Sequence, residues 1–199
     1  MEFLITMTTQ VPDGTAEDAI AEMRSREATR AAQLIGQGNL LRLWRPPLQP
    51  GEWRTYALFT AADVDELEEL LTSMPLRAWR TDEVTPLSEH PNDPARRGTT
   101  PVAAPGSEYF TWFTLVIPAD TAPETVAAVT AAEARCTAEL ASKGRLLRLW
   151  VLPGDGRALG LWAASDIDAM RADLETLPMV GWLGVDITPL SVHPSDPHA

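Results

Sequence analysis

Hydrophobic and polar residues alternate in short stretches of the chain, and segments with helical periodicity separate these stretches. FLITMT near the start and YFTWFTLVI in the second half alternate with a period of two, which predicts β-strands. Ala-rich segments from roughly Ala16 to Gln37 and from Pro123 to Ser142 have apolar residues three or four positions apart, which predicts helices. Gly38 and Gly144 follow where a helix end favours glycine. Both halves therefore begin with a strand and a helix.

The rest of each half also follows one order. LLRLWR or LLRLWV forms a second strand, a Pro/Gly turn follows, and RTYALFT or RALGLWA forms a third strand. A second helix begins at Ala62 or Ser165 and ends before the Met-Pro or Leu-Pro pair, and DEVTPL or VDITPL forms the last strand. The order βαββαβ predicts an α+β fold, a four-stranded antiparallel sheet with both helices on one face, which is the ferredoxin-like arrangement.

The two halves are copies of one unit. GNLLRLWR and GRLLRLWV begin 106 positions apart, at Gly38 and Gly144, and the turn that follows is three residues shorter in the second copy. VTPLSEHPNDP at 84–94 and ITPLSVHPSDP at 187–197 share eight of eleven residues. We therefore predict a tandem duplication with a first domain at 1–94, a Pro/Gly/Thr-rich linker at 95–107 and a second domain at 108–199. Since a sheet covered on one face leaves the other apolar, we expect an intramolecular pseudo-dimer of the dimeric α+β barrel type.

Composition narrows the class of protein. The 199 residues are 45% hydrophobic and 22% charged, which is typical of a packed globular protein. A net charge of −12 repels nucleic acid and anionic lipid, so neither is an expected partner. The start of the chain lacks a signal-peptide pattern and no apolar run is long enough to span a membrane, so we expect a cytoplasmic protein. A single cysteine, Cys136, excludes a disulfide framework and a cysteine-based metal cluster.

Each long helix carries a glutamate in the middle of its apolar stripe. Helical spacing places Glu27 among Met23, Ala31 and Leu34, and Glu133 occupies the same position in the second copy. An isolated carboxylate in an apolar layer costs several kcal/mol unless it is partnered or protonated. We therefore expect a compensating group beside each glutamate.

The repeated second strand contains candidate partners, because side chains alternate between the two faces of a strand. If Arg42 faces the helices, Glu27 and Arg42 line one cavity, and Glu133 and Arg148 line the other. With the opposite parity, Arg45 is the candidate in the first copy, and the second copy has none.

The glutamate and arginine pairs have two interpretations. They are structural ion pairs, or they belong to a ligand pocket. In such a pocket, apolar surroundings raise the pKa of the carboxyl so that it shuttles a proton, and the arginine holds an anionic or carbonyl-bearing substrate.

Aromatic residues and histidines are further candidates for substrate contact. Trp44 and Trp150 are repeated and serve either core packing or a pocket wall. Tyr56 is a leucine in the second copy, so the two pockets differ if this position faces the cavity. His90 and His193 lie in the repeated HPxDP tail, and they either dock the tail on the neighbouring half or contact substrate. They lack metal-ligand spacing, and no phosphate-binding loop appears, so we expect neither a metal nor another cofactor.

The order of these motifs resembles the muconolactone Δ-isomerase family over nearly the whole of each half. The residues that carry the resemblance are Glu27, Gly38, Leu43-Trp44-Arg45, Met74-Pro75 and His90-Pro91, then Glu133, Gly144, Leu149-Trp150, Leu177-Pro178 and His193-Pro194. The resemblance implies ferredoxin-like subunits that pair sheet to sheet and assemble into larger rings. It also implies a cofactor-free proton transfer that moves a C=C bond within an unsaturated lactone bearing a carboxylate. A glutamate base and an arginine that stabilises the enolate suit this chemistry.

Departures from the family pattern leave other functions open. Leu41-Arg42 and Leu147-Arg148 stand where the family tends to have Arg-His, and Arg45 has no counterpart in the second copy. These changes favour a different unsaturated or polycarbonyl substrate. The alternatives among enzymes are a polyketide-type cyclase, a dehydratase or a cofactor-free monooxygenase of secondary metabolism. The alternative from another class is a non-catalytic protein that binds a small molecule.

Overall fold

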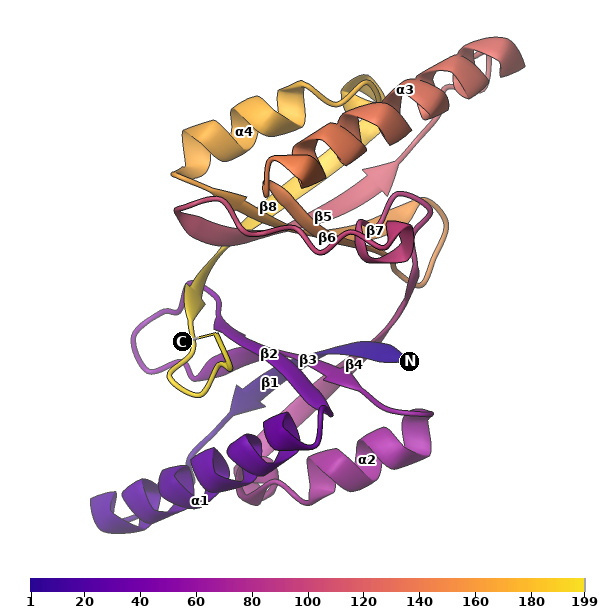
Figure 1. Ribbon diagram of the computed structural model, residues 1–199. Helices are drawn as coiled ribbons and strands as arrows, with labels where there is room; N and C mark the ends of the chain where they lie inside the picture. Colours follow the sequence, from indigo (N-terminus) through magenta and orange to yellow (C-terminus); the bar gives the residue numbers. More distant parts are fainter. Residues whose placement is uncertain (199) are drawn as a thin grey trace. The chain divides into compact units, whose positions relative to one another are not determined.

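The computed structural model describes residues 1–198 and contains two compact units (Figure 1). The first unit comprises Met1–Leu87 and the tail from Ser191 onward, and the second unit comprises Ser88–Leu190. Each unit therefore consists of one repeat without its own tail, together with the tail of the other repeat.

The first unit has a βαββαβ order. Its elements are β1 (Glu2–Thr9), α1 (Glu17–Gly36), β2 (Leu40–Arg45), β3 (Arg54–Thr60), α2 (Val64–Thr72), the 3-10 turn η1 (Pro75–Trp79) and β4 (Arg80–Glu89). The antiparallel sheet has the order β4-β1-β3-β2, and Ser191 and Val192 pair with the outer edge of β2. Helices α1 and α2 cover one face of this sheet (Figure 1).

The second unit repeats this arrangement. The short 3-10 turn η2 (Ala95–Arg97) precedes β5 (Ser107–Leu115), α3 (Pro123–Ser142), β6 (Leu146–Val151), β7 (Arg157–Ala164), α4 (Ile167–Glu175), the 3-10 turn η3 (Val180–Trp182) and β8 (Leu183–Val192). The sheet order is β8-β5-β7-β6, and Ser88 and Glu89 of β4 pair with β6. The predicted α+β class with ferredoxin-like βαββαβ units is confirmed. No helix in residues 1–198 is both long enough and apolar enough to cross a membrane.

The sequence pattern explains the helix-covered core of the first unit. Phe3, Ile5 and Met7 alternate along β1, face the helices and are buried. Leu34 of α1 and Leu71 of α2 pack onto them and are fully buried. This apolar layer packs α1 against the sheet. Glu27 lies on α1, in the stripe of residues that faces this layer.

A β-bulge interrupts the repeated strand in both units. The pairing of β2 with β3 shifts between Leu40 and Arg42, and as a result Leu40 and Leu43 both lie in the core under the helices. The pairing of β6 with β7 shifts at the equivalent place, and Leu146 and Leu149 share the second core. Simple alternation from Leu40, which would place Arg42 on the helix face, is therefore wrong.

The last strand of each unit is longer than the sequence predicts. Pro75 begins the 3-10 turn η1, and β4 starts directly after this turn at Arg80, opposite Thr9 of β1. The sequence pattern places the start of this strand at Asp82. The earlier start brings Arg80 into the sheet beside the helices.

Candidate active site

A cavity of about 430 Å³ lies in the first unit between α1, the sheet and the tail. Glu27 and Ala31 come from α1, Leu43 and Arg45 from β2, and His193 from the tail. The remaining lining residues are Met7, Thr9, Arg24, Ala28, Leu48, Glu52, Trp53, Thr55, Met74, Leu76, Arg80, Pro194 and Ser195. The first repeat therefore builds this cavity, and the tail of the second repeat supplies part of its wall.

The carboxyl group of Glu27 is held in place at both oxygens. Oε1 accepts a hydrogen bond from Nη1 of Arg80 at 2.9 Å, and Oε2 accepts one from the backbone N–H of Leu76 at 2.8 Å. The side chain is only 14% exposed. Burial raises the pKa of Glu27 above its usual value, and the Leu76 N–H and the Arg80 charge oppose this rise only in part. Glu27 is thus a fixed carboxyl whose proton affinity is raised.

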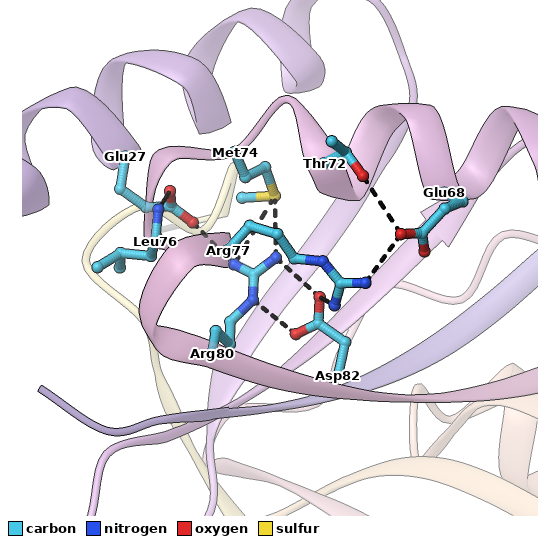
Figure 2. Close-up of polar contacts among 8 residues, drawn as sticks. All are labelled: Glu27, Glu68, Thr72, Met74, Leu76, Arg77, Arg80 and Asp82. Atoms are coloured by element: carbon cyan, nitrogen blue, oxygen red, sulfur yellow. Dashed lines mark hydrogen bonds and ion pairs between the residues drawn. The ribbon is translucent and has the colours of Figure 1, made fainter. Parts of the chain in front are cut away.

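Arg80 belongs to a chain of charged groups that runs from the cavity to the surface (Figure 2). Its Nε and Nη2 donate to Asp82 at 2.6 and 3.0 Å, and both side chains are nearly inaccessible to solvent. Arg77 donates to Asp82 at 2.8 Å and to Glu68 at 2.8 Å. Because Asp82 holds the Arg80 guanidinium, the cation beside Glu27 has a defined position.

The expected pairing of Glu27 with Arg42 is wrong, because the bulge turns Arg42 away from the cavity. Arg42 Nε instead pairs with Asp196 of the tail at 3.2 Å, and Asp196 also accepts the backbone N–H of Leu43 at 2.8 Å. The guanidinium lies 4.8 Å from the ring centre of Trp44. This cluster anchors the tail beside β2.

The second unit repeats this anchor, so the expected pairing of Glu133 with Arg148 is also wrong. Arg148 Nε pairs with Asp93 at 3.3 Å, and Asp93 accepts the N–H of Leu149 at 3.0 Å. The guanidinium lies 4.7 Å from the ring centre of Trp150. Both arginines thus hold tails.

The mouth of the first cavity is rich in charge. Arg45 lines it and is exposed. This agrees with the alternative in which Arg45, and not Arg42, is the candidate arginine of the first copy. Arg24 lies over the ring of Trp53 at 4.5 Å from its centre, and Glu52 contributes a carboxylate at the same rim. Two guanidinium groups therefore face the cavity in addition to Arg80.

His193 lines the first cavity as a neutral imidazole. Burial, reinforced by the nearby charge of Arg45 and opposed by Asp196, lowers the pKa of His193 to about 4. Its Nδ1 accepts the backbone N–H of Ser195 at 3.1 Å. The neutral ring therefore carries its proton on Nε2, which is available as a hydrogen-bond donor.

A second cavity, of about 300 Å³, occupies the equivalent place in the second unit. Glu133 is 8% exposed, and its Oε2 accepts the N–H of Met179 at 2.9 Å. Burial raises the pKa of Glu133, and the Met179 N–H lowers it to a smaller extent. His90 lines this cavity, burial lowers its pKa, and its Nδ1 accepts the N–H of Asn92 at 3.0 Å. The carboxyl and the imidazole are thus common to both cavities.

The cations are not common to both cavities. At the positions of Arg24, Arg45 and Arg80, the second copy has Thr130, Val151 and Leu183, all of which line the second cavity. Within the described residues, Glu133 therefore has no ion-pair partner. The two sites therefore differ in charge.

Three aromatic residues that were candidates for substrate contact, Trp44, Trp150 and Tyr56, do not line either cavity. Trp44 and Trp150 are 1% exposed and lie beside the arginines that hold the tails. Tyr56 is half-buried on β3, and burial raises its pKa. No group of three or more His, Cys, Asp or Glu in the described part of the chain is arranged to hold a metal ion.

Arg80, the ion-pair partner of Glu27, was not among the residues predicted from the sequence. Arg80 lies 53 positions from Glu27 and precedes the predicted start of its strand. A signal was present, because Arg80 and Asp82 both become apolar in the second copy, as Leu183 and Val185. When two opposite charges are both replaced by apolar residues in one copy, the two charged residues are expected to form an ion pair in the other copy.

The fold and the cavities define an α+β protein of two ferredoxin-like units, each with a buried carboxyl between helix and sheet. The model of the family "Muconolactone delta-isomerase" matches residues 1–93 and again residues 108–196. The chain therefore belongs to the muconolactone delta-isomerase family and contains its domain twice, which confirms the predicted tandem duplication.

Individual relatives match one domain. Muconolactone Delta-isomerase 1 of Acinetobacter lwoffii is 32% identical over 92 residues, which are 46% of this chain and 93% of that protein. The enzyme of Cupriavidus pinatubonensis is also 32% identical over 92 residues and is covered to 97%. These relatives support an isomerase-type enzyme.

A solved structure resembles the whole chain. A variant of chlorite dismutase from Candidatus Nitrospira defluvii aligns with a TM-score of 0.62 at 11% identity, over 96% of this chain and 91% of that chain. At this identity the likeness concerns the fold alone. Because the alignment covers nearly the whole of both chains, the fold of that chain includes both domains of this one.

Proposed function

We propose that the first cavity is the active site of a cofactor-free isomerase that moves a C=C bond within an unsaturated lactone bearing a carboxylate. The observation that carries the proposal is the buried carboxyl of Glu27 in one cavity with Arg45, Arg24 and the neutral His193. Membership of the family and the names of the relatives support the reaction class.

In the proposed reaction, ionised Glu27 removes a proton from a carbon conjugated with the lactone carbonyl. The C–H electron pair enters the conjugated system, and negative charge develops on the carbonyl oxygen. The same carboxyl then returns the proton to another carbon of the system, so that the double bond moves and no net proton is consumed. A base whose pKa lies closer to the working pH exchanges a proton more efficiently in both directions.

Two groups of the cavity suit the charges of such a substrate. The Nε2–H of neutral His193 is a donor for the carbonyl oxygen as it gains charge. The guanidinium of Arg45, which is exposed at the mouth and bound to no carboxylate in the described residues, suits the substrate carboxylate. Arg80 is already engaged by Glu27 and Asp82, so it serves to position the base.

The test replaces Glu27 by Gln, which keeps the size of the side chain and one of its two hydrogen-bond acceptors and removes the base. With muconolactone as the probe substrate in D₂O, proton NMR follows isomerisation and deuterium uptake together. We expect kcat/KM to fall by about 10²–10⁴ in Glu27→Gln, the range that a positioned general base contributes.

Glu133→Gln is the matched variant in the second cavity, and we expect it to retain isomerisation, because that cavity has Thr130 and Val151 in place of Arg24 and Arg45. A Glu27→Gln protein that isomerises at the wild-type rate would contradict the proposal. Binding of the substrate by Glu27→Gln without turnover distinguishes an enzyme from a protein that only binds small molecules.

A further inference from the structure

The second unit has several substitutions at and around Trp162, a wall residue of its cavity, and these substitutions fit one another. Trp162 replaces Phe59 of the first unit, Gly160 replaces Ala57, and Thr111 replaces Ile5. The indole Nε1 of Trp162 donates to Thr111 Oγ1 at 2.8 Å, and a Cβ on Gly160 would lie 2.3 Å from that nitrogen. The absence of a Cβ at Gly160 thus leaves room for the indole ring, and Thr111 provides a buried acceptor for its N–H.

These changes give the second cavity an aromatic wall. Phe113, which replaces Met7, contacts Trp162 edge to face with ring centres 6.5 Å apart and an angle of 65°. Both rings are buried and both line the cavity. Random loss of function would leave voids or unsatisfied polar groups, whereas no buried side-chain nitrogen or oxygen in the described residues lacks a hydrogen-bond partner.

Charge is nearly absent from this cavity. Among the described residues that line it, only Glu133 and Arg157 are able to carry a charge at neutral pH, since burial keeps His90 neutral. Arg157 is exposed and donates to the carbonyl of Pro153 at 3.3 Å. A carboxylate ligand would therefore meet Glu133 without a buried cation to compensate, which is unfavourable.

We propose that the second cavity is a separate binding site for an uncharged, planar small molecule with one hydroxyl or carbonyl group. Its ring lies against Phe113 and Trp162, and its polar group forms a hydrogen bond with the carboxyl of Glu133. The cavity volume of about 300 Å³ is at the lower end of the range for small-molecule sites. The inference does not rest on the proposed activity of the first cavity.

A pair of probes that differ only in charge tests this proposal. β-Naphthol is planar and uncharged and has one hydroxyl group, whereas β-naphthoate has a carboxylate on the same ring system. Isothermal titration of the full chain with each probe gives affinity and stoichiometry. We expect β-naphthol to bind in the second cavity and β-naphthoate to bind in the first.

Exchanging residues between the units assigns each probe to a cavity. Thr111→Ile/Gly160→Ala/Trp162→Phe restores the residues of the first unit and should weaken β-naphthol binding by about tenfold or more. Arg24→Thr/Arg45→Val introduces the residues of the second unit and should weaken β-naphthoate binding instead. A β-naphthol affinity that falls in the arginine variant and persists in the triple variant overturns the proposal.

A gain of binding provides an independent measurement should the triple variant fail to fold. Val151→Arg places at the second cavity the guanidinium that Arg45 provides at the first. We expect this variant to bind a second equivalent of β-naphthoate, with an affinity at least about tenfold above that of the wild-type second cavity. An unchanged stoichiometry for β-naphthoate, together with no detectable binding of β-naphthol to the wild type, overturns the proposal.

Discussion

At the scale of single residues, Glu27 and Glu133 occupy equivalent positions, and their neighbours give the two carboxyls different electrostatic surroundings. Burial raises the pKa of both, and a backbone N–H at 2.8 or 2.9 Å lowers each in part. In the described part of the chain, Glu27 forms an ion pair with Arg80, and Glu133 forms none. The duplicated glutamate is therefore an ion-paired base in one unit and an uncompensated carboxyl in the other.

Arg80 provides a prediction at this scale, because it links two buried carboxylates. Replacing Arg80 by Leu, the residue of the second unit, leaves Glu27 without its cation and Asp82 with Arg77 alone. We expect a loss of about 3–5 kcal/mol in the free energy of unfolding, as when one partner of a buried ion pair is removed. Urea denaturation followed by circular dichroism measures this loss.

The control for Arg80 is the double variant Arg80→Leu/Asp82→Val, which reproduces Leu183 and Val185 of the second unit. We expect it to regain part of the lost stability, since position 82 then has no buried carboxylate that depends on Arg80, while Glu27 stays without its cation. If the double variant is as unstable as the single one, the Arg80 and Asp82 pair is not what the single substitution breaks.

At the scale of elements, the tails complete the cavities. Asp196 binds Arg42 and the Leu43 N–H, and its side chain is fully buried. The turn that it anchors contains His193 and Ser195, whose contact sets the tautomer of the imidazole. The strand bulge that orients Arg42 toward Asp196 therefore also determines where the histidine lies.

Asp196→Ala tests the role of the tail. The substitution removes the acceptor for Leu43 N–H and the partner of Arg42, so the segment with His193 loses its anchor. We expect kcat/KM for isomerisation to fall by about tenfold or more through misplacement of the imidazole. Hydrogen exchange should show faster exchange of the Ser195 amide.

Asp93→Ala is the matched change in the second unit, where Asp93 makes the same contacts with Arg148 and Leu149. We expect it to leave isomerisation intact, because the tail that it anchors lines the second cavity. Equal losses of isomerisation in both variants would show that the tails act on overall stability and not on one cavity.

At the scale of the whole molecule, the sequence predicted most of the architecture because its signals are local. Alternation, helical spacing and helix-terminating glycines are read from neighbouring residues, and the same order appears in both copies of the repeat, so together they predict the βαββαβ order. The partner of Glu27 was not predictable in this way. It depends on a bulge at Leu40–Arg42 and on an early start of β4, both of which involve pairing with a distant strand.

Duplication within one chain also explains how the two cavities differ. Both copies keep the glutamate, the tail histidine and the arginine that holds the tail. The residues that differ include those that set charge at the mouth, such as Arg45 and Val151, and those that shape the wall of the second cavity, such as Trp162 in place of Phe59. Two domains in one chain are able to diverge in this way, whereas identical subunits of a homodimer are not.

The central claim is that the buried carboxyl of Glu27 shuttles the proton, and direct titration of this group tests it. Carbon-13 NMR of glutamate carboxyls, with Glu27→Gln to assign the signal, gives its pKa in the folded chain. We predict a pKa above the usual value of 4.5, and kcat/KM that increases with pH through the same pKa because only the ionised carboxyl accepts a proton. A Glu27 pKa at or below 4.5, or the same pH dependence in Glu27→Gln, would contradict the account.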